Sequence, residues 1–511
     1  GFWWTIGALV VSCILAHPRC ISFINRSSLN QTYSARLSRA YLGASNPLRH
    51  SNVGRNIDEV MPEDDVESFR NYRPFDAGGP LHVLGICVNE TLDQFTQREF
   101  RDRQGTSFAI SPLGLSVGRN WHALWQAARH NEESDHAESE SKHPIRAVGH
   151  TRGTPHPLLD INGHPPPRRR AGGLKQEGME ELPLRYWMSI SGAAFGSGLG
   201  QSTTRALSLL FTMANMRTGY WWDSGLSSAE RGARPQVSFV RRLIWLLPKF
   251  FVTQSRLIDE ALARFPGPWW RYWYLSDGGH FENLGAYELI RRRVPFIVVV
   301  DAGADPDYDF DDFANLQRKV RIDFRTHLEL FTEEDWDAAR NEHIQQARAE
   351  GADDAMIATK LGEWNDYFQP IRAALARPGL NGGTFDELTP PSDTDGSVIG
   401  PSPKHAALFK VIYPNVTGQS LLLYLKASLT GDEPSDLRHY HLENQDFPHQ
   451  STADQFFDEA QWESYRRLGE HIGARLLTPG PVGKADSGNA LWLTRLGLSR
   501  RSSGGITASR T

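Results

Sequence analysis

The sequence has few cysteines and no strong excess of either charge. Its 511 residues include only three cysteines, Cys13, Cys20 and Cys87, and this sparse, odd number excludes a disulfide framework and favours a reducing compartment. The formal net charge is −5, from 55 Lys and Arg against 60 Asp and Glu, and no basic array with interleaved aromatic residues is present. The charge pattern therefore gives no reason to expect a nucleic-acid partner.

Several common cofactor motifs are also missing. The chain has no Walker loop, no dinucleotide-binding fingerprint and no cysteine pairs spaced for zinc, so neither a cofactor nor a metal ion is expected. The acidic run from Asp307 to Asp312 lacks the glycine and the final glutamate that an EF-hand loop requires. His439, His441 and His449 match no ligand spacing of a metal site.

The longest uncharged apolar run stands at the N-terminus and is short. It extends from Phe2 to Ala16, whereas a membrane-spanning helix needs about 20 residues. The basic residues that precede the apolar core of a signal peptide are absent. We therefore expect residues 1–21 to form a hydrophobic segment, either a transmembrane helix cut short at Gly1, with Trp3 and Trp4 near one interface, or a buried core element.

Three segments have the composition of disordered insertions or linkers. Each mixes charge, proline, glycine and serine with almost no apolar periodicity, so it buries too little surface to offset the entropy of ordering. They are the insertion 132–182, the linker 377–403 and the tail 478–511. The remaining residues predict one catalytic domain in three parts, which are 22–131, 183–376 and 404–477.

Segments typical of strands and helices alternate in these parts and predict an α/β fold. Residues 295–300 (PFIVVV) form a uniformly apolar, β-branched run, which is typical of a central strand covered on both faces. Residues 408–413 and 420–426 are further strand candidates, and residues 454–473 have the pattern of a helix. The sequence therefore predicts a layered, mostly parallel central sheet flanked by helices.

A single carboxylate stands at a strand-to-helix turn in the stretch YLSDGGHFENLGAYELIRRR. Asp277 ends an apolar, aromatic strand, and Gly278 and Gly279 allow a sharp turn before a helical segment that begins near Phe281. The carboxyl ends of strands are where α/β sheets commonly build binding sites. Asp277 is therefore a candidate catalytic residue, and the alternative is a helix-capping aspartate in an ordinary turn.

The G-x-S-x-G pattern at residues 114–118 offers Ser116 as a candidate nucleophile. It follows the strand-like SFAI and precedes a helix-like segment, as in a nucleophile elbow. Against this role, Pro112 and Leu113 separate the strand from the pattern, and no glycine-rich oxyanion loop precedes it. A loop crossing the sheet is the alternative. The glycine-rich block 190–200 (ISGAAFGSGLG) lacks this spacing, and we expect its glycines to serve close packing.

Several blocks of the sequence resemble one family of lipid-cleaving enzymes. DGGHFENLGAYELIRRR, followed by FIVVVDAGADP, is similar to the aspartate segment of the patatin and cytosolic phospholipase A superfamily of lipid acyl hydrolases. Further blocks, in order, resemble the bacterial membrane-associated branch of that superfamily. They are SLNQTYSARLSRAYLGASNP, GGPLHVLGICVNETLD, SFAISPLGLSVG, SISGAAFGSGLG, and SLLLYLKASLTGDEP with FPHQSTADQFFDEAQWESYRRLGEHIG.

This resemblance implies a patatin-like fold and a Ser–Asp dyad without histidine. In such a dyad the serine attacks the ester carbonyl, the aspartate is the general base, and a glycine-rich loop supplies oxyanion donors. By position, Asp277 would be the base, with Gly278 and Gly279 shaping its turn. SFAISPLGLSVG resembles the family's segment after the elbow, so the nucleophile is expected upstream of Gly1 rather than at Ser116.

The resemblance also implies a substrate and a place of action. The substrate would be membrane phospholipid or another acyl lipid, and the protein would be associated with a membrane surface with its catalytic part in the cytoplasm. The alternative is a catalytically inactive, membrane-associated scaffold of the same fold, because no convincing nucleophile elbow is present in the sequence.

Overall fold

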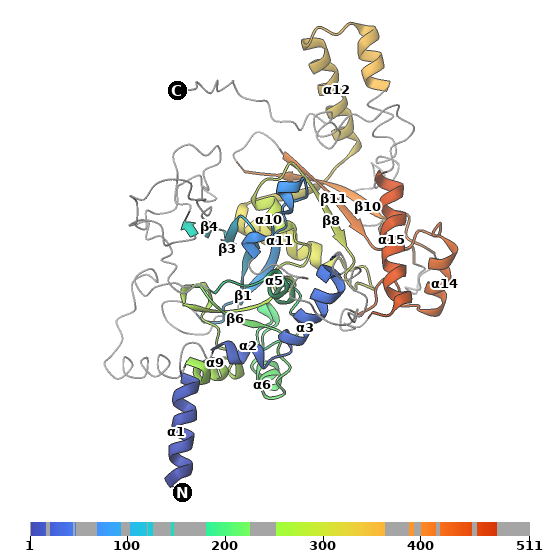
Figure 1. Ribbon diagram of the computed structural model, residues 1–511. Helices are drawn as coiled ribbons and strands as arrows, with labels where there is room; N and C mark the ends of the chain where they lie inside the picture. The colour runs from blue at the N-terminus through green and yellow to red at the C-terminus, as the bar shows by residue number, and fades with distance from the viewer. Residues whose placement is uncertain are drawn as a thin grey trace, which may run out of the picture. The chain divides into compact units, whose positions relative to one another are not determined.

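The structure, a computed structural model, divides into two compact units, each with a sheet of its own (Figure 1). The units are Gly1–Asn283 and Leu284–Thr511, so the division lies inside the predicted part 183–376. The structure describes residues 2–16, 21–43, 46, 69–92, 103–119, 121–125, 145–147, 180–224, 252–362, 388–392, 400–414, 419–451 and 457–477. The tail 478–511 and most of the segments 132–182 and 377–403 lie outside the described residues.

The first unit is built around a seven-stranded antiparallel sheet. Its strand order is β5-β4-β3-β2-β1-β7-β6, and every neighbouring pair is antiparallel. The strands are β1 (Leu84–Asn89), β2 (Gly105–Ser111), β3 (Gly114–Val117), β4 (Trp121–Trp125), β5 (Ile145–Ala147), β6 (Tyr220–Asp223) and β7 (Tyr272–Asp277). Only Pro112 and Leu113 separate β2 from β3, and such a short connection produces a hairpin rather than a parallel crossover.

One face of this sheet is apolar because alternate residues of its strands point the same way. Ile86 of β1 and Phe108 of β2 lie in a core cluster with Trp187 and Ile190 of α5 (Leu184–Ser191). The buried apolar residues of α5 recur every three positions, so a stripe of the helix covers the sheet. The rings of Phe108 and Trp187 meet edge to face, with centroids 5.9 Å apart.

The opposite face carries small and polar residues over part of its width. On β1 these are Gly85, Cys87 and Asn89, which alternate with the apolar positions. Where β6 and β7 pair, Trp221 and Tyr274 pack with residues of α2 (Ile21–Arg26) and α9 (Val252–Ala261). The first unit also contains α1 (Phe2–Ala16), α3 (Asn30–Leu37), η2 (Ser38–Leu42), η5 (Phe69–Asn71), η6 (Pro74–Ala77), η7 (Gly200–Ser202), α6 (Arg205–Met213), η8 (Gly267–Trp269) and η9 (Gly278–His280).

Helix α1 holds most of the predicted hydrophobic segment 1–21. Residues 2–11 of this helix are exposed, and Trp3 and Trp4 are 79% and 84% exposed. Among the helices that the structure describes, none combines the length and the apolar character that crossing a membrane requires.

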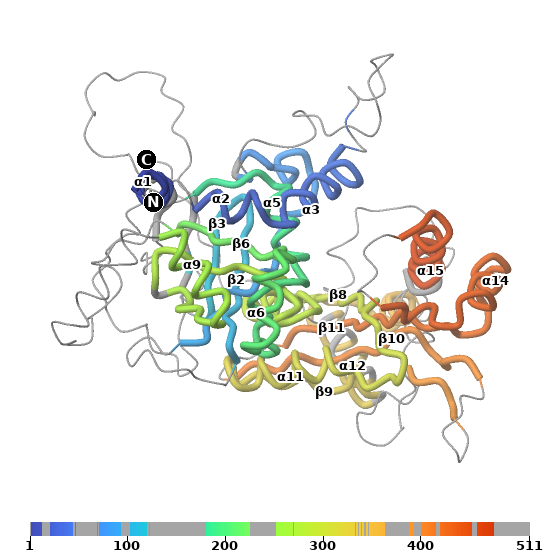
Figure 2. Tube along the Cα trace, turned by 90° about the horizontal axis from the view of Figure 1, so that it is seen from below, coloured from blue at the N-terminus to red at the C-terminus, as the bar shows by residue number. Residues whose placement is uncertain are grey.

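The second unit contains a four-stranded mixed sheet in the order β8-β11-β10-β9. Its strands are β8 (Phe296–Asp301), β9 (His327–Leu330), β10 (Ala406–Ile412) and β11 (Gln419–Lys426), and its helices are α10 (Ala286–Arg291), α11 (Asp311–Phe324), α12 (Glu333–Ala349), α14 (Ser435–Glu443) and α15 (Glu459–Leu477). Strand β11 is buried on both faces. Leu423 packs with Leu437 of α14 and Leu468 of α15, and Tyr424 packs against Phe313 of α11. Figure 2 shows α14 and α15 side by side at this sheet.

The predicted fold, a layered and mostly parallel patatin-like sheet, is wrong. The larger sheet is antiparallel throughout, and β8 with β11 is the one parallel pair among the described strands. The apolar run of β8 was misleading, because β8 is an edge strand rather than a central one. Its residues Ile297 and Val299 are buried, whereas Val298 and Val300 are 44% and 68% exposed.

Candidate functional site

Asp277 is the last residue of β7 and the N-cap of the short helix η9. Its Oδ1 accepts a hydrogen bond of 2.7 Å from the backbone N–H of Gly279. Its own backbone N–H donates to the carbonyl oxygen of Ala193, the second residue after α5, at 3.3 Å. The carboxylate is therefore aimed by its own turn, while its backbone is tied to the segment that follows α5.

Two glycines make this turn possible. A Cβ on Gly278 would lie 2.5 Å from the carbonyl oxygen of Gly85 in β1, which is closer than real Cβ atoms come to backbone. A Cβ on Gly279 would lie 2.5 Å from Oδ1 of Asn283 and 3.1 Å from Oδ1 of Asp277. The turn thus lies directly on β1, and a larger residue at either position would displace the groups around the carboxylate.

The environment of Asp277 changes its acidity. Burial raises the pKa of the Asp277 carboxyl to about 6, and the hydrogen bond from Gly279, which favours the charged form, opposes this rise. A carboxyl with this pKa is mostly ionised at neutral pH and is a stronger base than an ordinary aspartate. These are the properties that a general base near neutral pH requires.

A tyrosine and a serine lie around this turn. Burial, and secondly the charge of Asp277, raise the pKa of Tyr33 in α3. The Tyr33 hydroxyl lies against Gly192, where a Cβ would be 2.6 Å away. The Ser191 hydroxyl donates to the carbonyl oxygen of Gly85 at 2.7 Å, and is therefore engaged with the β1 backbone.

On the other face, a buried polar network supports the same turn. Asn89 donates from Nδ2 to Oγ of Ser276 at 2.8 Å, and Ser276 Oγ lies 2.9 Å from Nδ1 of His280. Asn89 Oδ1 accepts from the backbone N–H of Gly200 at 2.9 Å. Burial lowers the pKa of His280 to about 4, so its ring is neutral at pH 7. Sequence reasoning did not single out Tyr33, Asn89 or His280, because only the folded chain brings them to the turn.

Ser116 is not on an elbow. Residues Gly114–Val117 form β3, and Ser116 lies within that strand, paired with Ala109 on one side and His122 on the other. Its side chain is buried, and its Oγ lies 2.9 Å from Nδ1 of His122. The pattern of glycines around Ser116 therefore marks a hairpin strand rather than a strand–turn–helix nucleophile site.

The structure does not bring Ser116 to Asp277. Asp277 pairs with Ile86, Ile86 with Phe108, and Phe108 with Val117, the neighbour of Ser116. Three strand spacings of about 4.8 Å separate the two residues by about 14 Å along the sheet. Because adjacent residues of a strand point to opposite faces, the Ser116 side chain also points away from the face that carries Val117 and Ile86.

The glycine-rich block 190–200 serves close packing, as expected. The backbone amides of Gly192, Ala193 and Ala194 all donate to nearby carbonyl oxygens, so they form no cradle for an anion. A Cβ on Gly198 would lie 2.6 Å from the amide carbon of Asn89, and one on Gly200 would overlap the carbonyl oxygen of His280.

In the second unit, Asp301 ends β8 beside Lys426, the last residue of the parallel strand β11. Lys426 Nζ lies 3.2 Å from Asp301 and 2.8 Å from Asp305, and the Tyr424 hydroxyl donates to Asp301. Lys426 and Asp301 are almost fully buried and compensate each other's charge. These contacts form an ion-pair network, and a structural role is enough to explain it.

No protein-family model matches the chain, and no curated protein shows significant similarity to it.

Proposed function

We propose that this chain carries the general base of a lipid acyl hydrolase, an enzyme that cleaves carboxylic esters of phospholipids or related lipids. The observation that carries the proposal is the carboxyl of Asp277, which is held by the Gly279 amide and has a pKa of about 6. Asp277 would take the proton of a serine hydroxyl as its oxygen attacks the ester carbonyl, and would deliver it to the departing alcohol. Water would then hydrolyse the acyl-enzyme by the same route.

The serine partner is a separate part of the proposal. Within the described residues, the Asp277 carboxylate accepts a hydrogen bond from Gly279 and none from a serine hydroxyl. Ser116 is about 14 Å away along the sheet, and Ser191 donates to a backbone carbonyl. The nucleophile and its oxyanion donors would therefore come from a part of the protein that the structure does not describe.

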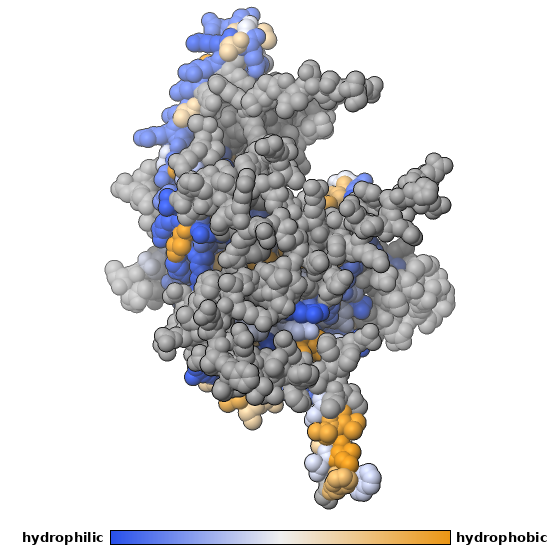
Figure 3. Space-filling model, turned by 90° about the vertical axis from the view of Figure 1, so that its left-hand side faces the viewer, coloured by the Kyte–Doolittle hydropathy of each residue, from blue (hydrophilic) through white to orange (hydrophobic). Residues whose placement is uncertain are grey.

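Helix α1 supports a lipid substrate and a membrane partner. Apolar residues recur along this helix, and the side chains from Phe2 to Val11 are exposed (Figure 3). Its first turns carry Trp3 and Trp4, and tryptophan is enriched where a membrane meets water. Under the proposal, α1 associates the enzyme with the membrane surface that holds its substrate, with the catalytic part on the cytoplasmic side.

A catalytically inactive membrane-associated scaffold is the second candidate. It is favoured by the position of Ser116. This serine lies in a buried strand rather than at a nucleophile elbow, and its hydroxyl contacts His122 rather than Asp277. The two candidates share the exposed helix α1 and differ in whether Asp277 acts on a substrate.

An assay of hydrolysis separates the hydrolase from the inactive scaffold. The product of the complete gene is tested on a fluorogenic ester and on phospholipid vesicles. Asp277→Asn should lower kcat by about 10²–10⁴-fold, the contribution typical of a general base. Asp259→Asn is the matched control, because burial also raises the pKa of Asp259, whose partner is Arg256 at 3.0 Å. Hydrolysis that survives Asp277→Asn would contradict the assignment, and vesicle binding without hydrolysis by the wild type would favour the scaffold.

A further inference from the structure

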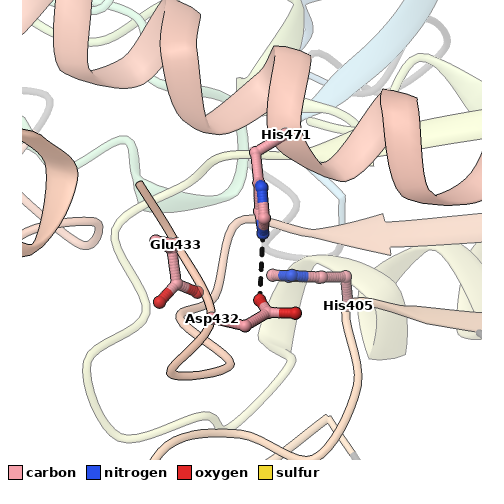
Figure 4. Close-up of side chains that lie close together, drawn as sticks. All are labelled: His405, Asp432, Glu433 and His471. Carbon is pink, nitrogen blue, oxygen red and sulfur yellow. Dashed lines mark hydrogen bonds and ion pairs between the residues drawn. The ribbon is translucent and has the colours of Figure 1, made fainter. Parts of the chain in front are cut away.

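Four side chains with metal-binding atoms converge in the second unit. They are His405, just before β10; Asp432 and Glu433, in the connection from β11 to α14; and His471, on α15. One ligand atom from each lies within 4.8 Å of the other three. Figure 4 shows His471 reaching from α15 to Asp432, with the ring of His405 beside the same carboxylate.

We propose that these four residues bind one divalent transition-metal ion of the zinc class. Two imidazoles and two carboxylates suit Zn²⁺, whereas Ca²⁺ and Mg²⁺ prefer sites made of oxygen atoms. In a tetrahedral zinc site with ligand bonds of about 2.0–2.2 Å, neighbouring ligand atoms are about 3.4 Å apart. His471 Nε2 and Asp432 Oδ1 are already 3.0 Å apart, and because all four ligand atoms lie within 4.8 Å of one another, the remaining pairs would need to close by about 1.4 Å at most.

The Thr430 hydroxyl indicates where the ion would lie. Its Oγ1 is 3.0 Å from His405 Nε2, 2.8 Å from Asp432 Oδ1 and 3.3 Å from Glu433 Oε1. A hydroxyl has one proton and can donate it to one of the two carboxylates at a time. A divalent cation bound among these three ligand atoms, beside the hydroxyl oxygen, would contact all three and would balance the charges of the two carboxylates.

The surroundings hold the ligands in place. Nδ1 of His405 lies 3.3 Å from the Ser428 hydroxyl, which leaves Nε2 directed at the site. Glu433 is almost fully buried and accepts hydrogen bonds from the backbone N–H groups of Thr430 and Gly431. Gly431 has a φ of +86°, a conformation that glycine adopts without strain. Such supporting contacts orient metal ligands and tune their affinity.

The proposed role of the ion is structural. Four protein ligands complete a tetrahedral zinc site and leave no open position for a substrate. The ligands come from the start of β10, the connection after β11 and helix α15, so the ion would fasten α15 to the sheet. This site is independent of the function proposed for Asp277.

Titration of the chelator-treated protein with ZnCl₂, followed by calorimetry, tests the site. We expect one Zn²⁺ per chain, a higher unfolding temperature with zinc, and no comparable effect of Mg²⁺ or Ca²⁺. Asp432→Asn should weaken zinc binding by about a hundredfold or more, since ligand atoms matter at least as much as their supporting contacts. His439→Gln is the matched control, because His439 is an exposed histidine 3.4 Å from Glu443 and outside the site.

The Asp432→Asn variant keeps the test free of folding effects, because Asp432 is exposed. Circular dichroism checks its fold, and Co²⁺ in place of Zn²⁺ gives the wild type an intense visible absorption typical of tetrahedral coordination. Wild-type protein that binds no zinc would overturn the proposal. Equal zinc binding by wild type and the folded Asp432→Asn variant would overturn it as well.

Discussion

The Gly279 amide and the Asp277 carboxylate are joined by a hydrogen bond of 2.7 Å across a single intervening residue. This contact aims the carboxylate and favours its charged form, while burial disfavours that form more strongly and raises the pKa to about 6. The turn therefore holds a carboxylate that is costly to ionise and well placed to accept a proton.

The raised pKa of Asp277 predicts a stability that depends on pH. In the unfolded chain the Asp277 carboxyl has a pKa near 3.9, about two units below its pKa in the folded state. Between these two pH values the folded state therefore binds more protons than the unfolded chain. Stability contributed by this group is therefore lost as the pH rises from about 4 to about 6. Asp277→Asn, which stays neutral, should raise the free energy of unfolding by about 1–3 kcal/mol at about pH 8 and by much less at about pH 4.

Urea unfolding at the two pH values measures this difference. The same gain or loss at both values would show that ionisation of Asp277 does not limit stability. Stabilisation that accompanies loss of hydrolysis would be typical of a catalytic group held in an unfavourable environment.

Gly278→Ala should destabilise the first unit by about 2–4 kcal/mol, as overpacking against a rigid neighbour does. The added Cβ would meet the backbone oxygen and carbon of Gly85 at 2.5 and 2.8 Å, and backbone cannot move aside as a side chain can. Gly85→Ala is the control, because a Cβ there meets nothing within 4 Å. Urea unfolding of both variants is the measurement, and equal effects would mean that Gly278 does not lie on β1 as described.

Ser116→Ala should leave ester hydrolysis at the wild-type rate. Its hydroxyl contacts His122 within the sheet, and loss of one such hydrogen bond costs about 1 kcal/mol of stability. Rates and unfolding free energies of the variant check both statements. Abolished hydrolysis in a folded Ser116→Ala variant would return Ser116 to the candidate nucleophiles.

Lys426→Met should destabilise the second unit by about 3–5 kcal/mol, because it leaves the buried carboxylate of Asp301 and the half-buried carboxylate of Asp305 without their cation. Lys410→Met on the neighbouring strand β10 is the matched control. Lys410 is less buried and pairs with Glu329 and Asp335, which are more exposed, so we expect about 1 kcal/mol. Similar losses for both variants, measured by denaturant unfolding, would argue against a special role of the Lys426 network.

The sequence predicted the turn at Asp277 because its signals are local. An apolar strand, an aspartate and two glycines stand next to each other, and the structure has the strand end and the turn at those residues. The sheet was not predictable in this way. Strand β1 pairs with β7, which is distant in the chain, and nothing in either strand specifies antiparallel pairing with that partner.

One short pattern was misleading and one proposed site had no short pattern, both for physical reasons. The glycines around Ser116 suit an elbow and a hairpin strand equally, and the two-residue connection Pro112–Leu113 decides for the hairpin. The proposed metal ligands extend from His405 to His471 on three elements, so they have none of the short spacings by which metal sites are recognised in sequences.

The pH dependence of ester hydrolysis tests most directly whether Asp277 is the general base. A base acts in its ionised form, so kcat/KM of the complete gene product should rise with pH, with a midpoint near the Asp277 pKa of about 6, and level off above it. Asp277→Asn should remove this rise together with most of the rate. A kcat/KM that stays constant through this range, or a rise that persists in Asp277→Asn, would contradict the account.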